Sequence, residues 1–309
     1  MIDLSVKSLA AYAYPEDGSK SPFSTWLHRS KFILRGLLYY PALRTLTQSI
    51  EPNTLIMLLQ KHRQFIEKPM RPYLTCHYSA KQRAELIVQH YQFLEHESMP
   101  RIVNSIYRKD HGLTLFSFEV DEQTYSMTLC YDSSYRREGE MALILRSPDS
   151  HAFYAVAFSL ATTKGIKQLR IGGLQGPASN VENNEKIKRL TKTLNGLRPK
   201  DLMLRILVIV ANLWQIEQVL AVKNHAHIYR SKRYRKYKVK ADYDAHWQTF
   251  SGTEFDRNFY LLPQFEHRKT PEEISRPKRA MYRRRYQWID DVTEQMRYHI
   301  GDQYTYDEA

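Results

Sequence analysis

The sequence predicts an α+β fold, in which N-terminal helices precede a mixed, mostly antiparallel sheet that is flanked by helices. Three observations lead to this prediction. Apolar residues recur every three or four positions through residues 24–110, which is typical of amphipathic helices. From Gly112 the apolar residues alternate with period two, as in strands. Residues 166–222 then contain a strand-like run, a glycine turn, helical runs and a second strand-like run.

The chain divides into a leader, one large domain and a tail. Residues 1–23 contain Pro15, Gly18 and Pro22, so we expect a loosely packed leader. Residues 24–290 form a single α+β domain, whose helical part covers 24–110 and whose sheet-containing part covers 112–290. Residues 291–309 are expected to be a mobile acidic tail.

Three helices are expected in the helical part. The first starts near Ser24 and is ended or kinked at Pro41. The second runs from Pro52 to about residue 66, and the third runs from Ser79, a good N-cap, to about residue 96.

The apolar side chains of the first helix have two interpretations. Trp26, Leu27, Leu37 and Leu38 lie at helical spacing, and we expect them to be core residues. The alternative is a helix that lies on a membrane surface, because basic residues are interspersed with them.

The sheet-containing part should begin as an antiparallel meander. Its expected strands cover residues 113–120, 125–131, 141–145, 153–160 and 168–171. A helix around 187–194 follows, and then a buried helix that starts at Pro199. The apolar run 219–222 is expected to be an interior strand.

Composition and charge favour an anionic partner. The chain has 309 residues, 22 of them tyrosines, and a formal net charge of +13. The inner-membrane surface, a lipid phosphate or an acidic protein would fit this charge. No secretory signal or apolar run of membrane-spanning length is visible, so we expect a cytoplasmic protein that can associate peripherally with the inner membrane.

Other partners are not indicated. The two cysteines form neither a disulfide framework nor a CxxC motif, and no metal site is expected. No zinc finger, RNP signature or zipper is present, so sequence-specific nucleic-acid binding is not expected.

A polar cluster after the last interior strand supplies catalytic candidates. His227 could act as a general base, Tyr229 could donate a proton, and Asn224 could orient a carbonyl group. The alternative is a polar strand end in which His227 bonds to the backbone.

Glu138 and Glu140 are further catalytic candidates. They are two residues apart at a strand start and should point to the same side, where they could bind a cation or supply a base. The alternative is a hairpin with solvated charges.

The glycine turn is a candidate phosphate site. Gly172, Gly173 and Gly176, together with Arg230, could hold a phosphate or cofactor near a helix N-terminus. The strand order would then resemble an acyltransferase (GNAT) domain, although the glycine spacing is one residue longer than in that family's loop. The alternative is a structural turn.

Two basic blocks rich in tyrosine predict an anion-binding surface. Arginine and lysine pair with phosphates while tyrosine rings stack or lie at an interface. The candidate residues are Arg233, Arg235 and Lys236 in the first block and Arg283, Arg284 and Arg285 in the second.

Several motifs together resemble the bacterial VirK/YbjX family. They are Arg137-Glu-Gly-Glu140, Ile171-Gly-Gly-Leu-Gln-Gly176, Leu197-Arg-Pro-Lys200, Asn224-x-x-His227-x-Tyr229-Arg230, Tyr243-Asp-x-x-Trp247 and Lys278-Arg-Ala-x-Tyr282-Arg-Arg-Arg-Tyr286. The resemblance covers roughly residues 25–290. It implies a Gram-negative bacterial protein associated with virulence, the cell envelope and survival of antimicrobial peptides. It supplies no reaction, because the family is a domain of unknown function.

Two functional hypotheses follow, and they leave open whether the protein is an enzyme. The first is an envelope-associated cytoplasmic factor without chemistry of its own, which acts on an anionic partner through its basic, tyrosine-rich surface. The second is an acyl- or group-transferase that uses acyl-CoA or another acyl thioester. Its site would lie between residues 172–176 and 224–229, with the basic block holding the cofactor phosphates.

Overall fold

The computed structural model describes most of the chain. The described residues are 4–18, 21–97, 99–108, 111–234, 236, 241–265 and 268–301.

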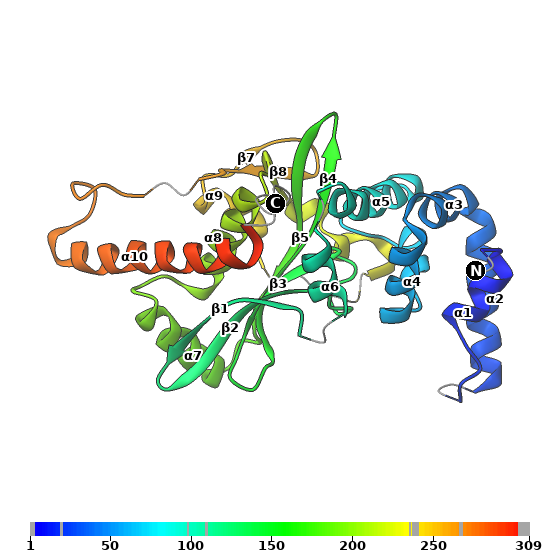
Figure 1. Cartoon of the computed structure of the whole chain (residues 1–309), viewed down its shortest axis with the longest axis horizontal. Coiled ribbons are helices and arrows are strands. Elements are labelled where there is room, and N and C mark those ends of the chain that lie inside the picture. The colour runs from blue at the N-terminus through cyan, green and yellow to red at the C-terminus, as the bar shows by residue number, and fades with distance from the viewer. Residues whose placement is uncertain are drawn as a thin grey trace, which may run out of the picture.

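The N-terminal third is helical, and α1–α4 lie at one end of the molecule while α6 lies beside the sheet (Figure 1). Its elements are α1 (Val6–Ala13), α2 (Pro22–Leu38), α3 (Tyr40–Ser49), α4 (Pro52–Lys61), the 3-10 helix η1 (Phe65–Met70), α5 (Ala80–His96) and α6 (Pro100–Arg108). Ser79 is the N-cap of α5, as expected: its hydroxyl accepts from the Gln82 backbone, and the Gln82 side chain accepts from the Ser79 N–H in return.

A mixed, mostly antiparallel sheet follows, which confirms the predicted α+β class. Its eight described strands are β1 (Leu113–Val120), β2 (Gln123–Cys130), β3 (Met141–Arg146), β4 (Ala152–Thr163), β5 (Ile166–Gln175), β6 (Gln218–Val222), β7 (Thr253–Glu254) and β8 (Phe259–Leu262). The spatial order is β1-β2-β3-β4-β5-β6-β8-β7. Among the described strands, β5 and β6 form the parallel pair, and the other pairs are antiparallel.

Helices cover the sheet and share one apolar core with it. The later helices are α7 (Val181–Thr193), α8 (Pro199–Leu213), α9 (Tyr243–Thr249) and α10 (Arg279–Met296), with short 3-10 turns at Asn224–Ala226 (η2), Ile228–Arg230 (η3), Lys232–Tyr234 (η4) and Arg276–Lys278 (η5), and a π turn at Arg297–Gly301 (η6). Residues 153–161 of β4 are buried without interruption, which requires cover on both faces of the strand. Both α5 and α8 pack against β4.

The two ends of the chain are better packed than the sequence predicted. Residues 6–13 form α1 rather than a loose leader, and Leu9 and Ala10 are fully buried because α1 packs against α2. The tail expected from residue 291 begins inside α10, where Val292 and Met296 are buried. Residues 302–309 lie outside the described part of the chain.

The outward side of α2 also differs from the prediction. Trp26, Leu37 and Leu38 were expected in the core, but their relative exposures are 61%, 62% and 69%. Phe32 and Gly36, on the other side of the helix, are the residues that pack inward. The apolar periodicity therefore identified the helix but not the face that is buried.

Candidate functional site

The segment Arg137-Glu-Gly-Glu140, which enters β3, lies at the centre of the candidate site. Its backbone is held on both sides: Leu74 N–H donates to the Arg137 carbonyl (2.8 Å), and Glu140 N–H donates to the Phe158 carbonyl (3.0 Å). A Cβ at Gly139 would lie 2.4 Å from Phe158 N, so the close approach requires glycine. Glu138 and Glu140 are each only 1% exposed, which overturns the alternative of a solvated hairpin.

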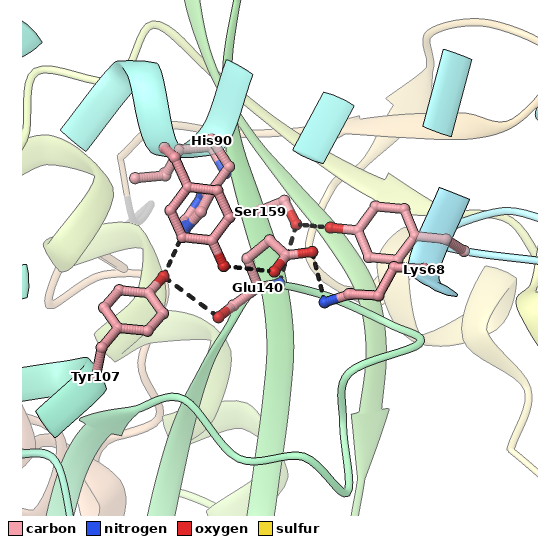
Figure 2. Close-up of polar contacts among 8 residues, drawn as sticks. Lys68, His90, Tyr107, Glu140 and Ser159 are labelled. Atoms are coloured by element: carbon pink, nitrogen blue, oxygen red, sulfur yellow. Dashed lines mark hydrogen bonds and ion pairs between the residues drawn. The ribbon is translucent and has the colours of Figure 1, made fainter. Parts of the chain in front are cut away.

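The Glu140 carboxylate is the centre of a buried polar network (Figure 2). One of its oxygens lies 2.6 Å from Lys68 Nζ, and the other accepts a hydrogen bond from the Tyr91 hydroxyl (2.7 Å). The Tyr107 hydroxyl lies 2.8 Å from His90 Nε2 and donates to the Glu140 carbonyl at 3.4 Å. His90 Nδ1 accepts from Leu160 N–H (3.0 Å), so Nε2 carries the proton that is donated to Tyr107.

Lys68 is an ammonium group held inside the protein. Its Nζ lies 5.6, 5.1 and 5.7 Å from the ring centroids of Phe65, Tyr73 and Tyr131. Burial lowers the pKa of Lys68, and the negative charge of Glu140 opposes that shift. The aromatic rings and the carboxylate together compensate for the lost hydration.

Glu138 forms a separate cluster with His227. Glu138 Oε1 lies 3.2 Å from His227 Nε2, and Glu138 Oε2 accepts from the Gln175 side chain. His227 Nδ1 accepts from Tyr229 N–H (3.4 Å), and the His227 ring stacks on Tyr243 with centroids 4.9 Å apart. Because His227 is 1% exposed, with Nδ1 bonded to the backbone and Nε2 facing the buried Glu138 carboxylate, the expected general base is not accessible to a substrate. The two carboxylates, expected to work as a pair, therefore serve separate clusters.

The glycine run makes room for Glu138 rather than for a phosphate. Gly172 and Gly173 lie within β5, at a bulge opposite Ala157–Phe158, so the strand does not end at Ile171 as expected. A Cβ at Gly172 would lie 1.9 Å from the Glu138 carbonyl oxygen, and one at Gly173 would lie 2.2 Å from Glu138 Oε1.

The expected helix N-terminus is also displaced from the glycines. A Cβ at Gly176 would lie 2.6 Å from the ring of Tyr154. Helix α7 begins only at Val181, and its N-cap Asn180 bonds to Asn183 N–H (2.8 Å). Gly173 and His227 do meet, as the sequence suggested, but they meet at a buried carboxylate.

The other residues after β6 have structural contacts. Asn224 Oδ1 accepts from Tyr243 N–H (2.8 Å) and its Nδ2 donates to Asp242 (2.7 Å), so its amide fixes the start of α9 instead of orienting a carbonyl group. Tyr229 is half-buried, and burial followed by the charge of Glu138 raises its pKa. Arg230 is exposed at the end of η3.

A small basic pocket opens beside these clusters. It has a cavity volume of about 30 Å³ and is lined by His62, Gln64, Glu67, Lys68, Arg71, Pro72, Tyr73, Arg136, Arg137 and Tyr234. These residues come from three segments that are far apart in the sequence, so periodicity and motif spacing could not group them. The adjacent segment 73–76 ties the parts together, since Thr75 forms a β-bridge with His227 and Cys76 N–H donates to the Ala226 carbonyl (2.9 Å).

The pocket has an excess of positive charge. Lys68, Arg71, Arg136 and Arg137 line it, and Glu67 is the one carboxylate among the described lining residues. Burial, followed by the charges of Lys68, Arg136 and Arg71, lowers the pKa of the neighbouring His62 to about 4. His62 is therefore neutral at pH 7. The arginine side chains, and not His62, make the pocket suited to an anion.

Contacts within the protein hold the pocket cations in place. Arg71 pairs with Glu67, Arg136 donates to the Ser133 carbonyl, and the Arg137 guanidinium lies 4.6 Å from the centroid of the Tyr234 ring. Cations that are ordered before a ligand arrives lose less conformational entropy on binding.

The two basic blocks of the sequence do not form one surface. Arg233 and Lys236 are exposed close to Tyr234, which lines the basic pocket, while Arg235 lies outside the described residues. The second block is on α10, which packs on β1 at the end of the molecule away from α1–α4 (Figure 1).

The second block also loses one of its expected cations. Arg283 and Arg284 are exposed, but Arg285 is only 8% exposed and donates twice to the Asn195 carbonyl (3.0 and 2.8 Å). Its guanidinium also lies 4.3 Å from the Tyr282 ring centroid. Arg285 is therefore not part of an anion-binding surface.

Neither a metal-binding cluster nor a membrane-spanning helix is found in the described part of the chain. It contains no group of three or more His, Cys, Asp or Glu side chains that could hold a metal ion. None of its helices combines the length and the apolar character needed to cross a membrane.

Fold and site define an α+β protein in which a helical N-terminal part and a mixed sheet enclose two buried carboxylate clusters beside a basic pocket. The chain belongs to the family described as "Protein of unknown function (DUF535)", which matches residues 23–298. It is 34% identical to "Uncharacterized protein YbjX" of Escherichia coli over 94% of this chain and 90% of the relative. This confirms the resemblance to the VirK/YbjX family.

Two proteins of Haemophilus influenzae, both described as uncharacterized, are also similar. One is 27% identical over 88% of each chain, and the other is 31% identical over about half of each chain (50% and 51%). No solved structure matches, so the acyltransferase-like arrangement has no structural counterpart to support it.

Proposed function

We propose that this protein is a bacterial envelope-associated factor that binds an anionic partner and has no chemistry of its own. The observation that carries the proposal is the basic pocket. Four basic side chains line its small cavity, and one carboxylate is among the other lining residues. Arg233 and Lys236, which are close in sequence to the pocket residue Tyr234, are exposed cations that could add to this charge. The resemblance to the VirK/YbjX family extends the proposal to a cytoplasmic site of action, at or near the inner membrane, and to a role in virulence and resistance to antimicrobial peptides.

The size and chemistry of the pocket indicate which part of the partner it binds. A cavity of about 30 Å³ takes a group of a few atoms, such as a phosphoryl or carboxyl group, and not a whole nucleotide. Arg71, Arg136 and Arg137 supply guanidinium groups, which can donate two parallel hydrogen bonds to either of these groups. Lys68 also lines the cavity, but its amino group is already paired with the Glu140 carboxylate at 2.6 Å, so the donors to a ligand come from the three arginines.

His62 provides a direct test with inorganic phosphate as the probe. An anion in the pocket would offset the cations that lower the His62 pKa, so phosphate should raise that pKa by about one unit or more from its value of about 4. The titration can be followed by NMR and assigned with His62→Gln. Arg136→Glu should abolish the phosphate effect, whereas Lys188→Glu, on exposed α7, should leave it intact. An unchanged His62 pKa at millimolar phosphate would contradict the proposal for phosphate groups, and the same titration with acetate tests carboxylates.

The exposed cations are tested separately. Reversing the charges of Arg233 and Lys236 should weaken binding to an anionic partner surface, with vesicles containing phosphatidylglycerol as the probe. The loss should shrink as salt is raised, because exposed charges are screened. Equal binding of wild type and variant would show that Arg233 and Lys236 do not contribute to the binding of an anionic partner.

The acyl- or group-transferase is the second candidate, and the contacts of β5 disfavour it. The Tyr243 hydroxyl donates to the Leu174 carbonyl (3.0 Å) and accepts from Leu174 N–H (3.2 Å), so a bound acyl chain would have to displace it there. The space beside Gly172 and Gly173 is occupied by Glu138. CoA and acyl-CoA at millimolar concentration should therefore leave the Tm unchanged. A rise in Tm of several degrees would instead support the transferase hypothesis.

A further inference from the structure

The outer side of α2 is an apolar surface that no element of the described chain covers. We call it the α2 apolar face. It consists of Phe23, Trp26, Leu34, Leu37 and Leu38, which are 72%, 61%, 69%, 62% and 69% exposed. At 3.6 residues per turn these side chains fall within about 120° of arc, so they form one continuous stripe along the helix.

The opposite side of α2 fixes the helix to the protein. Thr25, Phe32 and Gly36 are buried there. A Cβ at Gly36 would lie 2.6 Å from Val6 Cγ1, which shows how closely α1 approaches. The helix is thus held by a packed side while its apolar face points outward, and Figure 1 shows α2 at the extremity of the molecule.

The charge around the α2 apolar face has one sign. No aspartate or glutamate occurs between Asp17 and Glu51, whereas α2 and α3 carry Lys31, Arg35 and Arg44; Arg29 lies on the packed side, where it pairs with Glu16. Lys31 is exposed at the border of the stripe, and Arg44 is exposed on the following helix. An apolar face with cations nearby and no carboxylate in the same segment is complementary to a lipid surface, whose headgroups are anionic and whose interior is apolar.

We propose that the α2 apolar face lies in the headgroup region of an anionic lipid bilayer. Phe23 and Trp26 are aromatic residues of the kind that favour the membrane interface, and the leucines would reach the start of the acyl chains. Lys31 and its neighbouring cations pair with lipid phosphates. A second copy of this chain fits less well, because two such helices would bring cations together with no carboxylate in the segment to offset them.

Vesicle binding by the full-length chain tests this proposal. The protein should sediment with vesicles of phosphatidylcholine mixed with phosphatidylglycerol, and less with phosphatidylcholine alone. The emission of Trp26 should shift to shorter wavelength on binding and become protected from acrylamide. Trp26→Phe should lose most of the spectral change, because Trp214 and Trp247 are fully buried and Trp288 packs against Phe116 and Phe118.

The decisive variant replaces the leucines of the face. Leu34→Ser, Leu37→Ser and Leu38→Ser together should weaken vesicle binding by about tenfold or more, because binding scales with the apolar area inserted. The matched control is Val181→Ser with Phe265→Ser, which removes apolar side chains that are 79% and 74% exposed on other parts of the surface. The control should bind like the wild type, and an unchanged Tm shows that each variant is folded.

Further outcomes separate this proposal from the basic pocket and from self-association. Arg136→Glu should leave the blue shift of Trp26 on vesicles in place even if phosphate no longer affects His62, because the two surfaces are different. The proposal is overturned if the protein does not sediment with anionic vesicles, or if the leucine variant binds as well as the wild type. A dimer that the leucine variant dissociates, without vesicle binding by the wild type, would show that a second copy covers the face.

Discussion

The interior around Glu140 and the outer face of α2 depart from the usual distribution of residues in opposite directions. Around Glu140 the protein buries an ion pair, and its Glu140 and Lys68 side chains are 0% and 4% exposed. On α2 it exposes large apolar side chains such as Leu34. Charged residues are rarely buried without a partner, and contiguous apolar patches usually mark an interaction site.

The difference lies in how each departure is compensated. Glu140 and Lys68 are satisfied by partners inside the protein, including Tyr91 and three aromatic rings. The α2 apolar face has no such partner among the described residues, and the lipid bilayer that we propose would supply one. The interior cluster is therefore expected to contribute to stability, and α2 to contribute to binding.

The largest effect is expected from breaking the buried ion pair on one side. Lys68→Met leaves the Glu140 carboxylate buried without its cation, which should cost about 3–5 kcal/mol of unfolding free energy in urea. Lys68→Met combined with Glu140→Gln should recover much of that loss. The control Lys81→Met, in an exposed pair with Glu85 at 3.9 Å, should cost less than about 1 kcal/mol. A small loss for Lys68→Met would show that this cluster does not hold the interior together.

The pH dependence of stability is expected to be the next largest effect. Burial, followed by the charge of Lys68, lowers the pKa of His90 to about 3. In the unfolded chain the pKa of a histidine is about 6.5. Because the unfolded state binds the proton more tightly, the stabilising contribution is complete above about pH 6.5. It is lost progressively as the pH falls towards the folded value of about 3. Between pH 7 and 4.5 this loss should be about 2–3 kcal/mol.

The measurement compares unfolding free energies in urea at the two pH values. His90→Gln should reduce the pH-dependent loss even though it also lowers stability at pH 7, because the hydrogen bonds to Tyr107 and Leu160 change. His151→Gln, at an exposed histidine, should leave the pH-dependent loss unchanged. An equal pH dependence in wild type and His90→Gln would contradict the assignment to His90.

The smallest effect is expected on α2. Leu34→Ala should change the unfolding free energy by less than about 0.5 kcal/mol, because the side chain is 69% exposed. Leu46→Ala, at a fully buried position on α3, should cost about 2–5 kcal/mol. If Leu34→Ala were as destabilising as Leu46→Ala, the α2 apolar face would be packed inside the protein and the contrast between the two regions would disappear.

The sequence predicted the elements much better than the site. Ser79 was recognised as a helix N-cap, and the meander from β1 to β4 was predicted within a few residues, because caps and alternation are local signals. The glycines were expected to end a strand, either as a phosphate-binding loop or as a structural turn. Only the fold shows that Gly172 and Gly173 lie in a strand and accommodate Glu138.

By itself the sequence determined the α+β class, the order of helices and strands, the positive charge and the family, since these follow from composition, periodicity and motif order. The tertiary structure decided which face of α2 is buried, that Glu138 and Glu140 serve separate buried clusters, and that residues 62–73, 136–137 and 234 form one pocket. These features depend on contacts between segments far apart in the chain. A local pattern shows that a helix has an apolar side, but the packing of α1, α3 and η1 against α2 determines which side faces the solvent.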